Sequence, residues 1–348
     1  MNRRDFAKLT TLAAAGAGVP QAVAQGSFAL ARVAGMESML VADAATAGKP
    51  VGFAAVGLGS ISTAFMEACA NSPTVKITAL VTGHPETKGV HFSELYGIPK
   101  SSVYTYETFD QIRNNKDVEA LYIGLPNSMH REYTDRKLMI AYRMQYDPVW
   151  QQAVEIIQSG ALGKVQSFRG SFPSEQPAGA WRLTKQYGGG GSVMDVGIYP
   201  LNGIRYLSQE EPAEVSTVVA TRDRDDPRFA EVEQSVEWTM KFPSGIVASC
   251  GCSYGQQGPQ TLSVHGDQGW LSLSPAFGGG GIHMTGVAGG KKIDVTGTGQ
   301  GHFQLALEGE HMAACIRNNT QPKSPGEEGM KDLMAIEQIY KAAGTPIA

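Results

Sequence analysis

The sequence predicts two consecutive domains of different class: an α/β domain with a parallel, doubly wound sheet, then an α+β domain with a mostly antiparallel sheet. Three observations support this division. The chain has 348 residues, enough for about two domains at roughly 150 residues each. Short apolar runs alternate with helical patterns over residues 51–147, which is typical of parallel sheets. Beyond them, residues 148–348 hold longer strand patterns separated by Gly and Pro.

Composition excludes several classes of protein. The 29 basic and 33 acidic residues give a net charge of −4, so the chain lacks the positive surface that neutralises nucleic-acid phosphates. Its 4 cysteines are too few for a disulfide framework. No apolar run reaches the roughly 20 residues of a membrane-spanning helix. We expect a protein that binds a small molecule, with no nucleic-acid partner and no membrane contact beyond export.

The first 24 residues resemble an export signal. Arg3 and Arg4 precede a short apolar Ala/Gly-rich stretch, and Ala22-Val23-Ala24 offers a cleavage site. Adjacent arginines are typical of the twin-arginine type, which is read by a receptor. We therefore expect periplasmic or otherwise exported protein, with residues 25–50 forming an N-terminal arm. The alternative is an amphipathic N-terminus with no targeting role.

The elements of the first domain follow in a regular order. Residues 51–56 form a continuous apolar run suited to a strand buried on both faces. Strand and helix patterns then alternate: helix 63–70, strand 75–81, helix 88–96, strand 103–106, helix 109–114 and strand 120–125. This alternation predicts parallel strands joined by helical crossovers.

A glycine-rich turn joins the first strand to the first helix. The pattern Gly57-x-Gly59-x-x-Ser62 lets backbone N–H groups and a helix N-terminus approach a pyrophosphate. The sequence therefore favours a dinucleotide site over a purely structural turn. We expect the cofactor to contact Gly57, Leu58, Gly59, Ser60 and Ile61.

The end of the second strand predicts NADP rather than NAD. Enzymes that bind NAD usually carry a carboxylate there for the ribose hydroxyl, whereas this chain has Thr82, Gly83 and His84, with Lys88 shortly after. A carboxylate would repel a 2′-phosphate, and a hydroxyl or a cation would not. We add these four residues to the expected cofactor site.

The second domain is predicted from a series of strands with helices at both ends. The expected strands are 164–172, 213–222, 232–242, 246–254, 260–265, 270–273 and 291–295. The expected helices are 148–159, 193–207, 303–318 and 327–343. The glycines at 278–281 indicate a loop, because no strand-turn-helix context surrounds them.

One polar pair in this domain could carry chemistry. If 193–207 is a helix, Asp195 and Tyr199 lie at i and i+4 on one face, where a carboxylate and a phenol can manage a hydroxyl proton. Alone, such a pair is more often a satisfied polar couple. Cys250 and Cys252 alternate in a strand, which favours core packing, and the histidines lack metal-ligand spacing.

Motifs along most of the chain resemble the Gfo/Idh/MocA oxidoreductases, in particular the exported, glucose-fructose oxidoreductase-like branch. The matching segments are 56–59, 125–130, 142–143, 181–183, 194–199 and 324–330. The resemblance implies an NADP-binding Rossmann domain, an open-faced sheet domain, hydride transfer to or from a sugar, and dimers or tetramers built on the open sheet. It places Asp195 and Tyr199 at acid/base positions. The matched motifs add cofactor-binding candidates: Leu125, Asn127, His130, Arg143, Trp181 and Arg182.

The chain departs from the family pattern at one point. The family has a Glu-Lys-Pro motif after the fifth strand, and here the sequence passes from residues 125–136 directly to 137–143, as if about thirty residues were missing. Two functions therefore compete: an NADP-dependent sugar oxidoreductase, impaired by the missing lysine, and a non-catalytic relative that binds cofactor or sugar or only oligomerises. We expect 138–142 to pair with 120–125 after a short helix at 128–136, which would bring Arg143 toward the glycine turn.

Overall fold

The computed structural model describes residues 48–133 and 138–344. The expected export signal and almost all of the expected arm lie outside these residues and remain predictions. The boundary between residues 147 and 148 also remains a prediction. No helix within the described part of the chain is both long and apolar enough to cross a membrane.

The first sheet confirms the predicted α/β pattern. Its four parallel strands are β1 (Val51–Val56), β2 (Val75–Val81), β3 (Val103–Tyr104) and β4 (Ala120–Ile123), in the order β3-β2-β1-β4. β1 is buried along its whole length because it has a neighbour on each side and helices over its faces. The connecting helices are α3 (Ser60–Cys69), the π-helical η2 (Pro85–Gly89), α4 (Val90–Tyr96), and the 3-10 helices η3 (Lys100–Ser102) and η4 (Phe109–Asn114).

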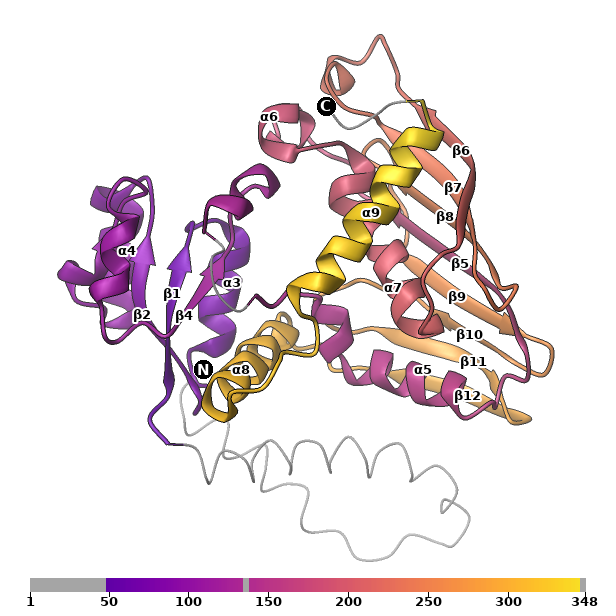
Figure 1. Cartoon of the computed structure of the whole chain (residues 1–348), viewed down its shortest axis with the longest axis horizontal. Helices are drawn as coiled ribbons and strands as arrows, with labels where there is room; N and C mark the ends of the chain where they lie inside the picture. Colours follow the sequence, from indigo (N-terminus) through magenta and orange to yellow (C-terminus); the bar gives the residue numbers. More distant parts are fainter. Residues whose placement is uncertain (1–47, 134–137, 345–348) are drawn as a thin grey trace, which may run out of the picture. The chain divides into compact units, whose positions relative to one another are not determined.

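One face of this sheet is covered by helices from distant parts of the sequence. Phe65 of α3 stacks on Tyr122 of β4 with ring centroids 3.8 Å apart. Helix α8 (Phe303–Asn318) lies against α3, and its Leu305 and Ala313 join the same apolar core (Figure 1). The C-terminal part of the chain therefore completes the core of the first sheet.

The expected pairing of residues 138–142 with β4 is wrong. Met139 instead forms an isolated bridge with Pro325, and the Ile140 N–H donates to the Ser324 carbonyl at 2.8 Å. The chain after β4 forms the 3-10 helix η5 (Asn127–Tyr133). Gly326 accommodates the new partner: a Cβ there would lie 3.0 Å from Leu138 Cδ2, so a larger residue would require the leucine side chain to shift.

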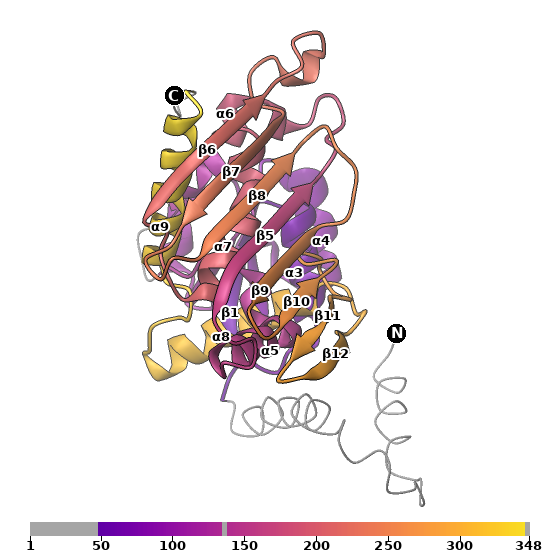
Figure 2. The same cartoon turned by 90° about the vertical axis from the view of Figure 1, so that its right-hand side faces the viewer.

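The second sheet has eight strands in the order β12-β11-β10-β9-β5-β8-β7-β6, with one parallel pair, β5 with β8. Helices α5, α7 and α9 cover one face (Figure 1), and Figure 2 looks onto the other face, on which the described residues form no helix. The strands are β5 (Val165–Pro173), β6 (Glu214–Thr221), β7 (Ser235–Lys241), β8 (Val247–Ser253), β9 (Thr261–Gly266), β10 (Trp270–Leu273), β11 (His283–Ala288) and β12 (Lys291–Thr296). The helices are α5 (Pro148–Gln158), α6 (Lys185–Gly188), α7 (Ile198–Ser208) and α9 (Gly326–Ala342), with 3-10 helices η6 (Arg143–Tyr146), η7 (Trp181–Leu183) and η9 (Pro227–Phe229).

Strand β11 was missed by the sequence reading. Gly286 lies in its middle, and glycine is uncommon in strands. A Cβ there would come within 2.1 Å of the Trp270 carbonyl oxygen. The close approach of β11 to β10 therefore requires glycine at position 286, and this glycine is also the reason that the sequence does not predict a strand there.

The interior of the second domain is strongly apolar. Trp150, Trp238 and Phe168 are almost fully buried between the sheet and its helices. Cys250 and Cys252 point into the same core as free thiols, and burial raises the pKa of both. Their predicted packing role is confirmed.

A buried ionic network joins three segments of this domain. Asp332 of α9 accepts hydrogen bonds from Arg205 and from Asn202 of α7, the latter at 2.9 Å. The hydroxyl of Tyr142 donates to the same carboxylate. Because Asp332 and Arg205 are both buried, each depends on its partners for the interactions that water supplies elsewhere.

Asp332→Ala should destabilise the protein by about 3 kcal/mol, because it leaves buried polar groups of two other segments without their acceptor. Equilibrium unfolding in urea measures the change. Glu337→Ala is the matched control, since Glu337 is an exposed carboxylate on the same helix. Equal losses in the two variants would show that the buried network contributes little.

Candidate functional site

The turn after β1 has the backbone geometry that a pyrophosphate site needs. Gly57 has a φ of 81°, a conformation that favours glycine, and a Cβ there would lie 2.6 Å from Leu125 Cδ2. Gly59 caps α3 with no side chain bonded to the helix N-terminus, and the space where its Cβ would be is open. The first N–H groups of α3 are therefore available to an anion.

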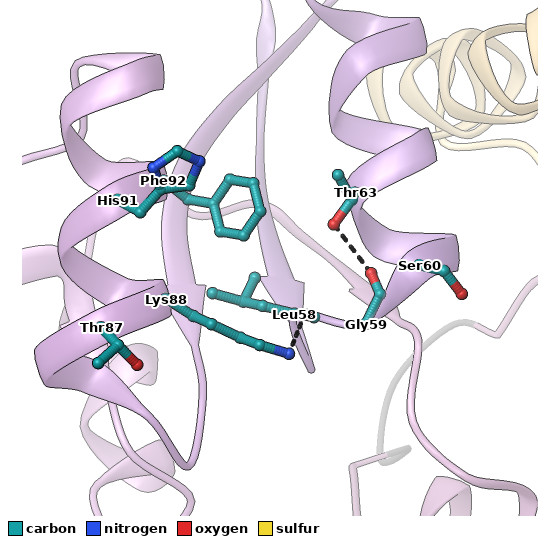
Figure 3. A pocket seen from close by; sticks show the side chains of 8 residues that line it. All are labelled: Leu58, Gly59, Ser60, Thr63, Thr87, Lys88, His91 and Phe92. Atoms are coloured by element: carbon teal, nitrogen blue, oxygen red, sulfur yellow. Dashed lines mark hydrogen bonds between the residues drawn. The ribbon is translucent and has the colours of Figure 1, made fainter. Parts of the chain in front are cut away.

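A groove of about 530 Å³ opens beside this turn. Its walls come from the turn, α3, η2 and α4, and the lining residues are Leu58, Gly59, Ser60, Thr63, Thr87, Lys88, His91 and Phe92. Figure 3 shows Lys88 reaching across the groove, where its Nζ donates to the Leu58 carbonyl at 3.0 Å. This places a cation next to the anion-binding turn.

The sequence reading found Lys88 but missed His91 and Phe92, which lie on the same wall (Figure 3). The spacing 88, 91 and 92 corresponds to i, i+3 and i+4, which share one face of a helix. That periodicity was the signal that could have identified them.

The residues after β2 divide into buried and exposed positions. Thr82 is buried, and its hydroxyl accepts the His84 N–H at 3.1 Å. Gly83 and His84 are exposed at the sheet end. This edge of the groove therefore carries no carboxylate from Thr82 to His84.

Asp195 lies in a polar cluster at the start of α7. Its Oδ2 accepts hydrogen bonds from Arg182 Nε at 2.9 Å and from the Tyr254 hydroxyl at 3.0 Å. Burial, followed by the charge of Asp195, raises the pKa of Tyr254, so this phenol stays protonated. Arg182 also lies over the Trp181 ring, 4.5 Å from its centroid.

Tyr199 contacts a different set of groups. Its ring packs against Phe172 and Phe277 with centroid distances of 5.0 and 5.9 Å. The Arg143 guanidinium carbon lies 5.7 Å from the Tyr199 ring centroid, and Arg143 Nη2 donates to the Phe277 carbonyl at 2.8 Å. Arg143 is thus the cation beside Tyr199.

The expected single α-helix from 193 to 207 is wrong at its start. Residues Val193–Gly197 form the π-helical turn η8, and α7 begins at Ile198. Asp195 lies within this π-helical turn, and Tyr199 lies in the first turn of α7. Asp195 and Tyr199 have separate neighbours in the structure. Such turns occur frequently at functional sites.

The remaining predicted residues lie near the ends of β4 and α3. Asn127 Nδ2 donates to the Gly188 carbonyl at 3.4 Å, and His130 Nε2 donates to the Leu125 carbonyl at 2.9 Å. Ile61 is 42% exposed on the first turn of α3. No group of three or more potential metal ligands occurs within residues 48–133 and 138–344.

Comparisons with known proteins agree on the two domains. Residues 51–140 match the model of the oxidoreductase family with an NAD-binding Rossmann fold, and residues 150–272 match the GFO/IDH/MocA C-terminal domain. The structure of the aldose-aldose oxidoreductase from Caulobacter crescentus, complexed with glycerol, is similar with a TM-score of 0.80 and 35% identity, over 85% of this chain and 98% of that one.

Two further comparisons extend this result. D-xylose 1-dehydrogenase [NADP(+)] from Haloarcula marismortui is 26% identical, over 85% of this chain and 92% of that protein. A 3-ketoreductase from Actinomadura kijaniata, in complex with NADP and TDP-benzene, shares the fold with a TM-score of 0.71 and 18% identity, over 84% of this chain and 98% of that one.

Gly124→Ala should destabilise the protein by about 1 to 3 kcal/mol, the usual cost of overpacking. The added Cβ would lie 2.1 Å from Ser62 Oγ, which is buried without a hydrogen-bond partner among the described residues. Ser62→Ala alone should be neutral or stabilising, because it removes an unsatisfied polar atom. In a protein that already carries Ser62→Ala, the loss of stability caused by Gly124→Ala should be smaller. Equilibrium unfolding in urea measures the difference. If Gly124→Ala reduces stability equally with Ser62 and with Ala at position 62, the contact with Ser62 Oγ is not the cause.

Proposed function

Because the chain belongs to the Gfo/Idh/MocA oxidoreductases, we propose that it is an NADP-dependent oxidoreductase acting on sugars, similar to glucose-fructose oxidoreductase. The observation that carries the proposal is the groove beside the Gly57–Ser60 turn, where an open helix N-terminus and the Lys88 cation lie together. The D-xylose dehydrogenase named as NADP(+)-dependent and the 3-ketoreductase solved with NADP support NADP as the cofactor of this chain.

The groove fits the phosphate groups of NADP. The N-terminus of α3 would hold the pyrophosphate, since its N–H groups have no side-chain cap. Lys88 and the exposed His84 would face the 2′-phosphate, where the missing carboxylate avoids repulsion. Phe92 offers an aromatic surface on the same wall.

Bound NADP supplies a carbon that accepts or gives a hydride. The chain's own contribution is to orient the sugar and to move a proton. In the reductive direction, the Tyr199 hydroxyl would donate the proton that the sugar oxygen needs as the carbonyl is reduced. Asp195, held by Arg182 and Tyr254, is an acceptor fixed in place for a sugar hydroxyl.

Aldoses are the substrate class that the relatives favour. Two proteins that match over most of their length are named for reactions of aldoses, the aldose-aldose oxidoreductase and the D-xylose dehydrogenase. We extend this class to the present chain. We also propose that the uncovered face of the second sheet, seen in Figure 2, is where two copies associate.

A non-catalytic relative that binds cofactor or sugar is the second candidate. The observation that favours it is the set of cations at the site: Arg143 lies beside Tyr199, and Arg182 bonds to Asp195. Arginine does not release its proton at working pH, so it cannot replace the lysine of the Glu-Lys-Pro motif as an acid. Such a protein would bind NADP without turning over an aldose.

Lys88→Ala should weaken NADP binding by about tenfold or more, because a charged contact to the 2′-phosphate is lost. Binding of NAD should change little, since NAD lacks that phosphate. Calorimetric titration of both nucleotides measures the difference. Lys76→Ala is the control, because Lys76 is an exposed lysine on β2. Equal or tighter NAD binding by the unaltered protein would contradict NADP as cofactor.

Tyr199→Phe should lower the rate of aldose turnover by about 10² or more, the usual effect of losing a general acid. The nicotinamide absorbance band follows the reaction with xylose or glucose as substrate. Tyr206→Phe, a variant of another tyrosine on α7, should retain the rate. An unchanged rate in Tyr199→Phe would remove Tyr199 from the mechanism, and NADP binding without turnover in the unaltered chain would favour the second candidate.

A further inference from the structure

Glu308 is a buried carboxyl that the proposed reaction does not use. It lies on α8, which packs against α3 and η6, and its residue is 1% exposed. Neither carboxyl oxygen has a hydrogen-bond partner among the described residues. Buried carboxyl groups are normally paired, so this position needs an explanation.

Burial has a direct consequence for the charge of Glu308. Removal from water raises its pKa to about 8, and the Arg143 charge opposes that rise. The carboxyl is therefore protonated at neutral pH and ionises in the mildly alkaline range. An ionised carboxylate at this depth is costly unless a donor reaches it.

Arg143 connects Glu308 to the candidate site. Its guanidinium lies beside the Tyr199 ring and donates to the Phe277 carbonyl, a neutral acceptor. The pKa of the Tyr122 hydroxyl, on β4, responds to the same groups. Burial raises this pKa most, and the charges of Glu308, Cys69 and Tyr199 raise it further. The charge of Arg143 lowers it. The cluster therefore joins α8, η6, β4 and α7.

The titratable neighbours of Glu308 come from every element packed around it. They are Cys69 of α3, Tyr122 of β4, Arg143 and Tyr146 of η6, and Glu310 of α8 itself. Arg143 is the cation whose charge acts on Glu308. His311 of α8 and Lys323 also lie nearby, because both contact the Tyr146 ring. The charged residue of β2, Lys76, is exposed.

We propose that Glu308 is a positioning residue whose protonation state decides where the Arg143 guanidinium lies. When Glu308 is protonated, Arg143 stays beside Tyr199 and the Phe277 carbonyl. When Glu308 ionises, Arg143 turns to the carboxylate and leaves Tyr199. The driving force is the attraction between two opposite charges in a buried place, which the bond to the neutral Phe277 carbonyl lacks, and the carboxylate has no other hydrogen-bond partner among the described residues.

The movement of Arg143 does not depend on the proposed function. Only its consequence does, because losing the cation beside Tyr199 matters for catalysis if Tyr199 is the proton donor. The test of this movement needs neither cofactor nor sugar. The full chain is labelled with ¹³Cζ-tyrosine, and the Tyr199 resonance is identified by its absence from the spectrum of Tyr199→Phe. We expect this resonance to shift in one step centred near pH 8, following the ionisation of Glu308.

Glu308→Gln should abolish the step and keep the Tyr199 resonance at its low-pH position. Arg143→Gln should abolish it as well, because the guanidinium transmits the change. Glu310→Gln is the matched control: Glu310 lies on the same helix but accepts from Ser72 at 2.8 Å, and this variant should retain the step. A step that persists in Glu308→Gln, or no step in the unaltered chain, would overturn the proposal.

A stability measurement shows independently whether Glu308 titrates. Because its pKa is raised from 4.5 to about 8 in the folded protein, ionisation costs stability from pH 4.5 upward, and the full cost is reached above about 8. The gain in Tm of Glu308→Gln over the unaltered chain should grow across this window and then level off. A growing gain without a Tyr199 step would show that Glu308 titrates while Arg143 stays in place, which refutes the proposal. A gain that does not change with pH would refute the titration of Glu308 itself.

Discussion

The carboxylate of Asp332 is the constraint on which the candidate site depends. It holds Arg205 and Asn202 of α7 and the hydroxyl of Tyr142 at one buried point of α9. Tyr142 precedes Arg143, and α7 carries Tyr199. Asp332 therefore links the residue before Arg143 to the helix that carries Tyr199, and as a buried carboxylate it depends on these partners.

The parallel sheet that ends at β4 explains much of the remaining arrangement. Parallel crossovers need a dozen or more residues, and residues 138–140 pack instead beside Ser324, Pro325 and the start of α9. Strand β4 has only four residues, and short edge strands limit unwanted pairing with other chains. Helices α3 and α8 cover one face of the sheet through Phe65 and Leu305. The first domain thus obtains part of its core from the last third of the chain.

The candidate site consists of two differently charged parts. The groove at the turn after β1 offers free N–H groups and Lys88, which suit phosphates. The second part, around Asp195 and Tyr199, contains two arginines, each already bonded within the protein. Among the described residues, Arg182 has a carboxylate partner, whereas Arg143 contacts a backbone carbonyl and an aromatic ring. This difference leaves Arg143 free to respond to the buried Glu308.

The sequence by itself determined the features that depend on short-range patterns. Strands β1 and β2, the glycine turn and helix α8 were predicted with their bounds, because apolar periodicity and glycine placement are local properties. Tertiary structure alone decided the partners. Residues 138–142 carry a strand pattern, and the structure packs the first of them beside Pro325 and α9 rather than beside β4. The π-helical form of the turn at Val193–Gly197 was not predicted, and no local pattern marks Glu308 as a buried carboxyl without a hydrogen-bond partner among the described residues. Burial can be inferred from sequence, whereas the choice of partner depends on which segments the fold brings together.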